Sequence, residues 1–227
     1  MTFNQLKMAI YATYLTNLYG FRLKKVESYE DKKMLRTEYS NRLLKKLNIE
    51  IKVINEDKIP KDGQYLLISN HRTIIDPSII EVATQNTKIH GYWIAKKELY
   101  DSFFFGMFVR NAGTIILDRE SSQMSGFFKD IRKVVKSGNS VYIFPEGTRN
   151  QSDKPLGEFK GGAEKIAKMN KIDMLPVFIK NRADKILSLA IKDSSVHRVI
   201  EVEFGDLIAY KDAEATYEDS YKQRFGI

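Results

Sequence analysis

The sequence predicts a single α/β domain with a mixed, largely parallel sheet flanked by helices, preceded by an N-terminal amphipathic two-helix hairpin. Short apolar runs typical of buried strands recur along the chain, helical patterns lie between them, and the first 48 residues carry apolar side chains at helical spacing. The chain has 227 residues, 43% of them hydrophobic, which suits one folded core. We therefore divide it into a hairpin over residues 1–48 and an α/β domain over 49–227.

The first 48 residues predict two amphipathic helices. In the first helix an apolar stripe, interrupted by Lys7, consists of Phe3, Ile10, Tyr14, Leu18 and Phe21. Ser28, followed by Asp31, predicts a capped start for the second helix, whose basic residues, Lys33 and Arg36 among them, are expected at its surface. Such a pair suits either a membrane interface or packing against the protein core, and the sequence leaves both open.

Seven short apolar runs predict the strands of the sheet. They cover residues 49–53, 65–69, 92–95, 114–117, 141–144, 174–179 and 199–204. Helices are predicted over about residues 77–86, 122–137 and 158–169. Because parallel strands in such folds end at one edge of the sheet, residues that directly follow a strand are candidates for an active site.

Composition narrows the function classes. The chain has no cysteine, which excludes a disulfide scaffold, a zinc–thiolate site and thiol catalysis and makes the cytosol the natural compartment. The apolar stretch over 8–21 has 14 residues, against about 20 for a spanning helix, and positive charges follow it, so we expect no signal peptide. The net charge of +8 suits an anionic partner, but no nucleic-acid-binding motif accompanies it.

The first chemical constellation is Asn-His-Arg-Thr-Ile-Ile-Asp over residues 70–76. His71 directly follows a predicted strand, and Asp76 with Pro77 predicts the cap and first residue of a helix. In the loop between them, Asp76 can hold the Nδ1 proton of His71 and leave Nε2 free as a general base. The alternative is a helix cap beside an unrelated loop histidine, because the H-x4-D spacing alone is a weak pattern.

The second constellation is Phe-Pro-Glu-Gly-Thr-Arg over residues 144–149, again after a strand. The glycine allows backbone N–H groups to approach an anion, and Arg149 offers planar recognition of a phosphate. Alone, the segment also suits a Pro-Gly turn with a surface salt bridge.

Together these blocks resemble the glycerolipid acyltransferase family, specifically its bacterial 1-acylglycerol-3-phosphate acyltransferases. The resemblance covers residues 70–76, 113–119, 144–149 and 175–177 in the family's order, with 159–162 between the last two, and spans roughly 49–180. Thr73 stands where the family more often has Ser, and Asn150 follows the third block where Ser is common. Neither difference removes an expected catalytic group.

The resemblance implies transfer of a fatty acyl chain from a thioester, acyl carrier protein or coenzyme A, to the sn-2 hydroxyl of 1-acylglycerol-3-phosphate, giving phosphatidate. His71 would be the general base and Asp76 would orient it, with no covalent intermediate, no metal and no cofactor beyond the acyl thioester co-substrate. The residues implied in acceptor binding are Lys96, Arg119, Glu146, Gly147, Thr148 and Arg149. Among these, Arg149 and the backbone of the third block would hold the phosphate, and Glu146 would orient Arg149 or the glycerol.

The implied partners are lysophosphatidate, an acyl thioester, an anionic membrane surface and an acyl carrier protein, with the enzyme peripheral or monotopic on the cytoplasmic face of the cell membrane. The Phe-rich segment over 102–109 suits the core, a wall of the acyl groove or a membrane-facing patch. Three alternatives stay open: a different acceptor, such as glycerol 3-phosphate or another lysolipid; a metal-dependent phosphoesterase using His71, Asp76 and Glu146; and a non-catalytic lipid-binding protein of the same fold.

Overall fold

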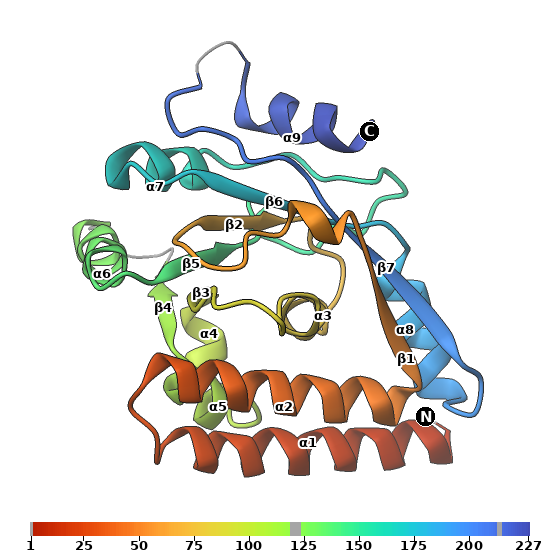
Figure 1. Cartoon of the computed structure of the whole chain (residues 1–227). Helices are drawn as coiled ribbons and strands as arrows, with labels where there is room; N and C mark the ends of the chain where they lie inside the picture. Colours follow the sequence, from red (N-terminus) through yellow and green to blue (C-terminus); the bar gives the residue numbers. More distant parts are fainter. Residues whose placement is uncertain (1, 119–123, 213–214) are drawn as a thin grey trace.

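A seven-stranded sheet forms the centre of the protein, seen in a computed structural model that describes residues 2–118, 124–212 and 215–227 (Figure 1). Its order is β1-β7-β6-β2-β5-β3-β4. The strands are β1 (Ile49–Ile54), β2 (Leu66–Ser69), β3 (Gly91–Lys96), β4 (Thr114–Leu117), β5 (Ser140–Ile143), β6 (Met174–Ile179) and β7 (Arg198–Phe204). From β6 to β4 all neighbours are parallel, and only β6 and β7 pair antiparallel. The predicted mixed, largely parallel sheet is therefore confirmed.

Helices cover both faces of this sheet (Figure 1). They are α1 (Phe3–Leu23), α2 (Tyr29–Leu47), α3 (Asp76–Ala83), α4 (Lys97–Tyr100), α5 (Gly106–Asn111), α6 (Ser125–Lys136), α7 (Gly162–Asn170), α8 (Ala183–Lys192) and α9 (Tyr217–Phe225), with a 3-10 turn, η1 (Glu56–Lys58). The hairpin packs with α3 and α8 on one face, and α6, α7 and α9 pack on the other. The helices α4, α5, α8 and α9 were not among those predicted from the sequence.

The central strands carry apolar side chains on both faces, which is why they read as continuous apolar runs. Leu67 of β2 and Leu175 of β6 belong to the core on the hairpin side. Their neighbours Leu66, Ile68 and Met174 belong to the core on the opposite side. Side chains alternate between the two faces of a strand, so a strand buried on both sides needs apolar residues throughout.

The hairpin packs on the core, but not through the stripe that the sequence suggested. Ser28 caps α2 as predicted, accepting a hydrogen bond from the Asp31 backbone at 3.1 Å. The core-facing row of α1 is Met8, Leu15, Tyr19 and Leu23. Most of the predicted stripe lies at the surface instead, with Phe3, Ile10 and Tyr14 each more than 60% exposed, whereas Leu18 packs against the core as predicted. The hairpin and the sheet share one hydrophobic cluster, and the division at residue 48 stays a prediction.

A buried ion cluster joins α2 to α3 and β3. Lys33 Nζ and Arg36 Nε lie 3.0 and 2.7 Å from the two carboxylate oxygens of Glu81, and all three side chains are almost fully buried. Trp93 Nε1 also donates to Glu81, at 2.8 Å. The expectation that Lys33 and Arg36 face solvent is therefore wrong, because Glu81 of the neighbouring helix draws both cations inward.

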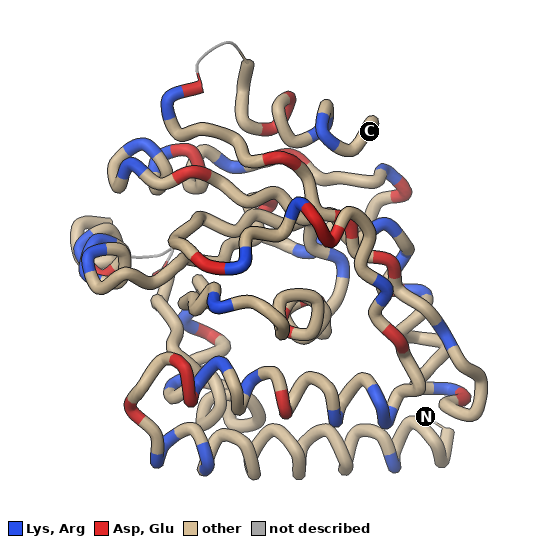
Figure 2. Tube along the Cα trace, in the orientation of Figure 1, with Lys and Arg blue, Asp and Glu red and all other residues tan. Residues whose placement is uncertain are grey.

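Charge is unevenly spread over the molecule (Figure 2). The long middle part of α1 carries no charged residue, and basic residues lie toward both of its ends. None of the helices in the described ranges combines the length and apolar character that crossing a membrane requires.

Candidate active site

Three of the strands that precede the predicted site residues end at one edge of the sheet. His71 follows β2, the segment 144–149 follows β5, and Lys96 is the last residue of β3. These strands are neighbours and parallel, so the topology brings their carboxyl ends together. β4 ends at the same edge, but Arg119, which follows it, lies outside the described residues.

His71 and Asp76 form the predicted pair. His71 Nδ1 lies 2.7 Å from Asp76 Oδ2, and Asp76 is fully buried while the His71 side chain is 19% exposed. Asp76 Oδ2 also accepts from the backbone N–H groups of Arg72 and Thr73, at 2.6 and 2.8 Å. A carboxylate oxygen accepts hydrogen bonds, so the Nδ1 atom carries the proton, and the other ring nitrogen, Nε2, is the one free to act as a base.

The helix after this loop begins one residue earlier than the sequence suggested. Asp76 is the first helical residue of α3 and Ile75 is its N-cap, with no side-chain cap hydrogen bond. The predicted cap at Asp76 is therefore wrong. Its carboxylate instead turns back into the loop that holds His71, where it accepts from two backbone amides and from Thr73 Oγ1 at 3.1 Å.

Two side chains of the first block anchor the loop to its surroundings. The Asn70 side chain pairs with the backbone of Ile179 at the end of β6, donating at 3.0 Å and accepting at 2.8 Å. The Arg72 guanidinium donates to the backbone carbonyls of Ser152 and Lys154. Sequence analysis assigned neither role, although both residues lie in the block it singled out.

Glu146 has contacts other than the predicted ones. It is 4% exposed, and its two oxygens accept from the backbone N–H groups of His71 at 2.7 Å and Gly157 at 2.8 Å. A Cβ atom at Gly157 would clash with the same carboxylate, so a larger residue there would have to displace Glu146. Burial raises the pKa of Glu146, and the two amide hydrogen bonds oppose that shift. Glu146 thus contacts the His71 loop and the Gly157 backbone, and its predicted role toward Arg149 or the glycerol stays a prediction.

The rest of the third block forms an open turn. Gly147 has a φ of 68°, a conformation that favours glycine. The side chains of Thr148 and Arg149 are exposed, and in the described part of the chain neither has a hydrogen-bond or ion-pair partner. Lys96 is half-buried at the end of the neighbouring strand β3. The turn and the strand end thus present two cationic side chains at the edge where His71 lies.

A stack of aromatic rings adjoins the histidine. The His71 imidazole lies nearly parallel to the Phe144 ring, with centroids 4.1 Å apart and an interplanar angle of 10°. Trp93 in turn stacks on Phe144 at 5.3 Å. Sequence analysis assigned no role to either aromatic residue. Phe144 lies in the third block, whereas the sequence around Trp93 is an apolar run like any other buried strand.

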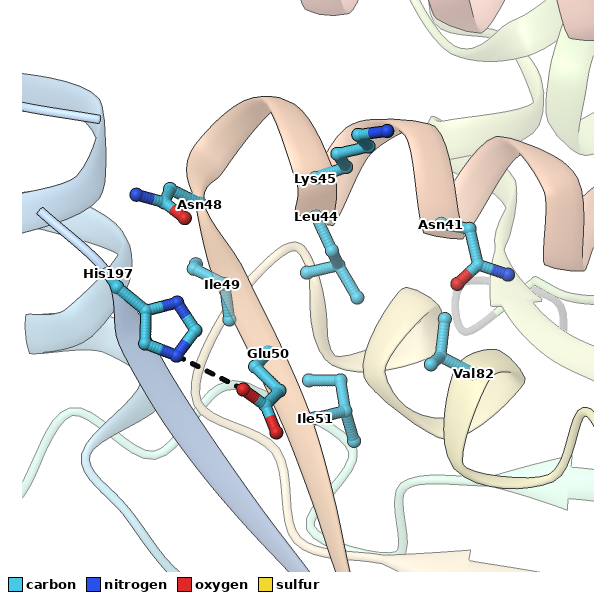
Figure 3. A pocket seen from close by; sticks show the side chains of 9 residues that line it. All are labelled: Asn41, Leu44, Lys45, Asn48, Ile49, Glu50, Ile51, Val82 and His197. Atoms are coloured by element: carbon cyan, nitrogen blue, oxygen red, sulfur yellow. Dashed lines mark ion pairs between the residues drawn. The ribbon is translucent and has the colours of Figure 1, made fainter. Parts of the chain in front are cut away.

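A surface pocket with a cavity volume of about 360 Å³ lies apart from these residues (Figure 3). Its floor is apolar, made by Leu44, Ile51 and Val82, and His197 pairs with Glu50 at its rim at 3.1 Å. None of the predicted site residues lines it.

The fold and the site define a class of protein: an α/β protein with a carboxylate-oriented histidine beside a cationic turn at the carboxyl edge of its sheet. Such a pair can remove a proton from a hydroxyl group, and the turn can bind an anion next to it. A sequence profile of the Acyltransferase family matches residues 50–180, more than half of the chain. The protein belongs to this family.

Relatives with established names support the assignment. The chain is 39% identical over 124 residues to a 1-acyl-sn-glycerol-3-phosphate acyltransferase of Streptococcus pneumoniae, covering 54% of this chain and 44% of that protein. It is 34% identical over 126 residues to the Bacillus subtilis protein of the same name, covering 56% and 60%. The chain thus spans about half the length of these relatives.

The fold itself is similar to a solved structure. The crystal structure of the lysophosphatidate acyltransferase PlsC from Thermotoga maritima aligns with a TM-score of 0.70 and 20% sequence identity, covering 98% of this chain and 92% of that one. The likeness includes the N-terminal helices, because nearly the whole chain is covered.

Proposed function

We propose that this protein transfers a fatty acyl chain from an acyl thioester to the free sn-2 hydroxyl of 1-acylglycerol-3-phosphate, giving phosphatidate for phospholipid biosynthesis. The observation that carries the proposal is the 2.7 Å contact between His71 Nδ1 and Asp76 Oδ2, at the sheet edge that also bears Arg149. The names of the Streptococcus and Bacillus relatives support this choice of acceptor.

The pair supports a direct transfer. Asp76 fixes the Nδ1 proton, so Nε2 of His71 removes the hydroxyl proton as the acceptor oxygen attacks the thioester carbonyl carbon. The new C–O bond forms, the C–S bond breaks, and the imidazolium returns its proton to the leaving thiolate. The reaction needs only the acceptor, the acyl thioester and the His71–Asp76 pair, so we propose no metal and no further cofactor.

The turn after β5 supports the acceptor site. Arg149 is exposed beside the Gly147 turn, and its planar guanidinium suits bidentate binding of a phosphate. We propose that the backbone around Gly147 and Thr148, together with Lys96 and Arg119, completes this site. The donor is acyl carrier protein or coenzyme A, both anionic, which suits a chain with a net charge of +8.

The contacts of the carboxylates favour acyl transfer over a metal-dependent phosphoesterase. Both oxygens of Asp76 and both of Glu146 already accept hydrogen bonds from the His71 loop and its neighbours. Within the described ranges, no group of three or more His, Asp or Glu side chains is arranged to hold a metal ion. A non-catalytic lipid-binding protein would retain the fold without needing an oriented histidine.

The first experiment measures thiol release from a C16 acyl thioester in detergent micelles, with and without lysophosphatidate. We expect release that depends on lysophosphatidate. If thiol is released only with glycerol 3-phosphate or another lysolipid, the protein is still an acyltransferase, but lysophosphatidate is not its acceptor. No release with any acceptor or donor would overturn the proposal in favour of the non-catalytic alternative.

Replacing Arg149 by alanine tests the acceptor site. We expect KM for lysophosphatidate to rise about 10- to 100-fold with little change in kcat, because a charge-assisted hydrogen bond to the phosphate contributes about 1.5–3 kcal/mol. Arg132→Ala is the control, since Arg132 is also an exposed arginine, on α6. Equal KM values for the two variants would contradict the assignment of Arg149.

We also propose that the protein lies on the anionic cytoplasmic face of the cell membrane as a peripheral or monotopic protein. The exposed row of α1, Phe3, Ile10, Tyr14 and Phe21, forms one apolar face of that helix. The loop between α4 and α5 adds Phe103, which is 91% exposed, and α5 packs against α1 beside Gly20. An apolar face with basic residues toward its ends suits insertion into the headgroup region.

The double variant Ile10→Ser, Tyr14→Ser tests this membrane face. Each side chain contributes on the order of 1 kcal/mol or more of apolar burial, so we expect binding to vesicles containing anionic phospholipid to weaken at least about 10-fold. Met169→Ser on α7, which is 41% exposed on the opposite side of the sheet, serves as the control. Cosedimentation measures both, and equal binding by the double variant and the control would contradict the proposal.

A further inference from the structure

We infer that Trp93 is a positioning residue for His71, acting through Phe144, and that the buried Glu81 holds Trp93 in place. The inference rests on the proposed function where it predicts that kcat depends on the position of His71. Trp93 and Glu81 both lie outside the sequence blocks of the acyltransferase family, and their contacts are independent of the function.

The sheet register puts the three rings in a row. Trp93 of β3 lies opposite Tyr142 of β5, and Phe144 follows two residues later. Residues two apart along an extended segment project to the same side, so Phe144 extends toward His71 from the position of Tyr142. Trp93 stacks on Phe144 at 5.3 Å and 27°, and Phe144 stacks on the imidazole at 4.1 Å and 10°.

The stack and Asp76 restrain different motions of the imidazole. The hydrogen bond to Asp76 fixes the position of Nδ1 but leaves the ring free to tilt about that contact. A flat aromatic neighbour opposes the tilt, because a tilted ring loses contact with Phe144. Phe144 is itself only half-buried, whereas Trp93 is 7% exposed and gives it a fixed surface.

Glu81 restrains the indole in turn. Its Oε1 accepts from Trp93 Nε1 at 2.8 Å and from Arg36 Nε at 2.7 Å. Arg36 also donates to the carbonyls of Ala112 and Gly91, at 2.6 and 3.0 Å, so the carboxylate is itself held. A continuous series of contacts therefore runs from α2 through Glu81, Trp93 and Phe144 to the general base.

The test compares Trp93→Leu with Trp93→Phe. Small displacements of a catalytic group lower rates strongly, so we expect Trp93→Leu to reduce kcat about 10- to 100-fold with both KM values within about twofold of wild type. Trp93→Phe keeps a ring against Phe144 but loses the donor to Glu81, and we expect it to reduce kcat only about threefold. Phe178→Leu removes a buried ring from the opposite core and serves as the control for lost packing.

Proton NMR of the histidines gives a second readout that does not need activity. The chain has three histidines, so the His71 ring signal is assignable by substitution. In Trp93→Leu we expect that signal to shift as the ring-current effect of Phe144 changes, with the signal of the exposed His197 unchanged. The same shift in Phe178→Leu, or no shift in Trp93→Leu, would overturn the inference, as would equal kcat values for these two variants.

The two proposals fail in distinguishable ways. A wild-type protein that releases no thiol with any acceptor overturns the proposed function, and the NMR comparison then still decides whether Trp93 holds His71. An active wild type whose Trp93→Leu variant changes only KM overturns the positioning role and leaves the proposed function intact.

Discussion

Replacing His71 by alanine is expected to lower kcat for acyl transfer at least 10²-fold, the usual contribution of a positioned general base. The acceptor hydroxyl would then have to lose its proton to water, since no other described group occupies the position of Nε2 beside Asp76. KM for the thioester should change little, because nothing assigns His71 to donor binding. Steady-state thiol release measures both constants.

A companion variant separates orientation from proton removal. Asp76→Asn keeps the size of the side chain but removes its negative charge, which stabilises the imidazolium formed when His71 takes a proton. It also leaves a single acceptor oxygen for the four donors that Asp76 Oδ1 and Oδ2 now serve. We expect a loss of kcat comparable to that of His71→Ala. Full activity of His71→Ala would contradict the proposed base, and full activity of Asp76→Asn would contradict the proposed role of Asp76 in orienting it.

Replacing Glu81 by glutamine is expected to lower the free energy of unfolding by about 3–5 kcal/mol, because two buried cations would lose the one carboxylate that pairs with them among the described residues. Glu38→Gln is a close control. Glu38 also pairs with two cations, Arg22 and Arg42, each at 2.9 Å, but it lies at the surface. There we expect a loss below about 1 kcal/mol. Urea denaturation measures both, and equal losses would show that burial adds nothing to the cluster.

The Glu81 carboxylate should also make the free energy of unfolding depend on pH in the acid range. Burial alone would raise the pKa of Glu81, but Arg36 and Lys33 outweigh it and lower that pKa from 4.5 to about 2. A pKa lowered by folding contributes stability above the unfolded value, and the contribution is lost as the pH falls from about 4.5 toward 2. The difference in stability between wild type and Glu81→Gln should therefore narrow over that range. A difference independent of pH would contradict the low pKa.

Apolar patterning was sufficient to predict the strands, and the reason is their burial. β6 was predicted with its observed bounds, and all six of its residues are buried. β4 was also predicted with its observed bounds, although only Ile115 in it is buried. The short helix α5 and the polar helix α9 were missed. Helix α9 buries only Tyr217, Ser220 and Tyr221, which is too few for a recognisable stripe.

The candidate site was predictable in its residue types more than in its contacts. The spacing of His71 and Asp76 allowed a pair, and the loop geometry completes it. The contacts of Glu146 could not be predicted, because a buried carboxylate and an exposed one look alike in sequence. Only the fold shows that its partners are backbone amides. Trp93 and Glu81 meet across β3 and α3, a contact that sequence spacing does not reveal.

The place of β1 in the sheet bears on how the chain folds during synthesis. β1 is an edge strand whose partner is β7, and their register joins Ile49 to Arg198. At ribosomal rates of about 5–20 residues per second, β1 waits roughly 7–30 seconds for that partner to be made. Until then only the hairpin and α3, which also contacts β1, can cover it. A nascent chain arrested before β7 should therefore expose the amino-terminal strand to proteases that do not cleave the finished protein.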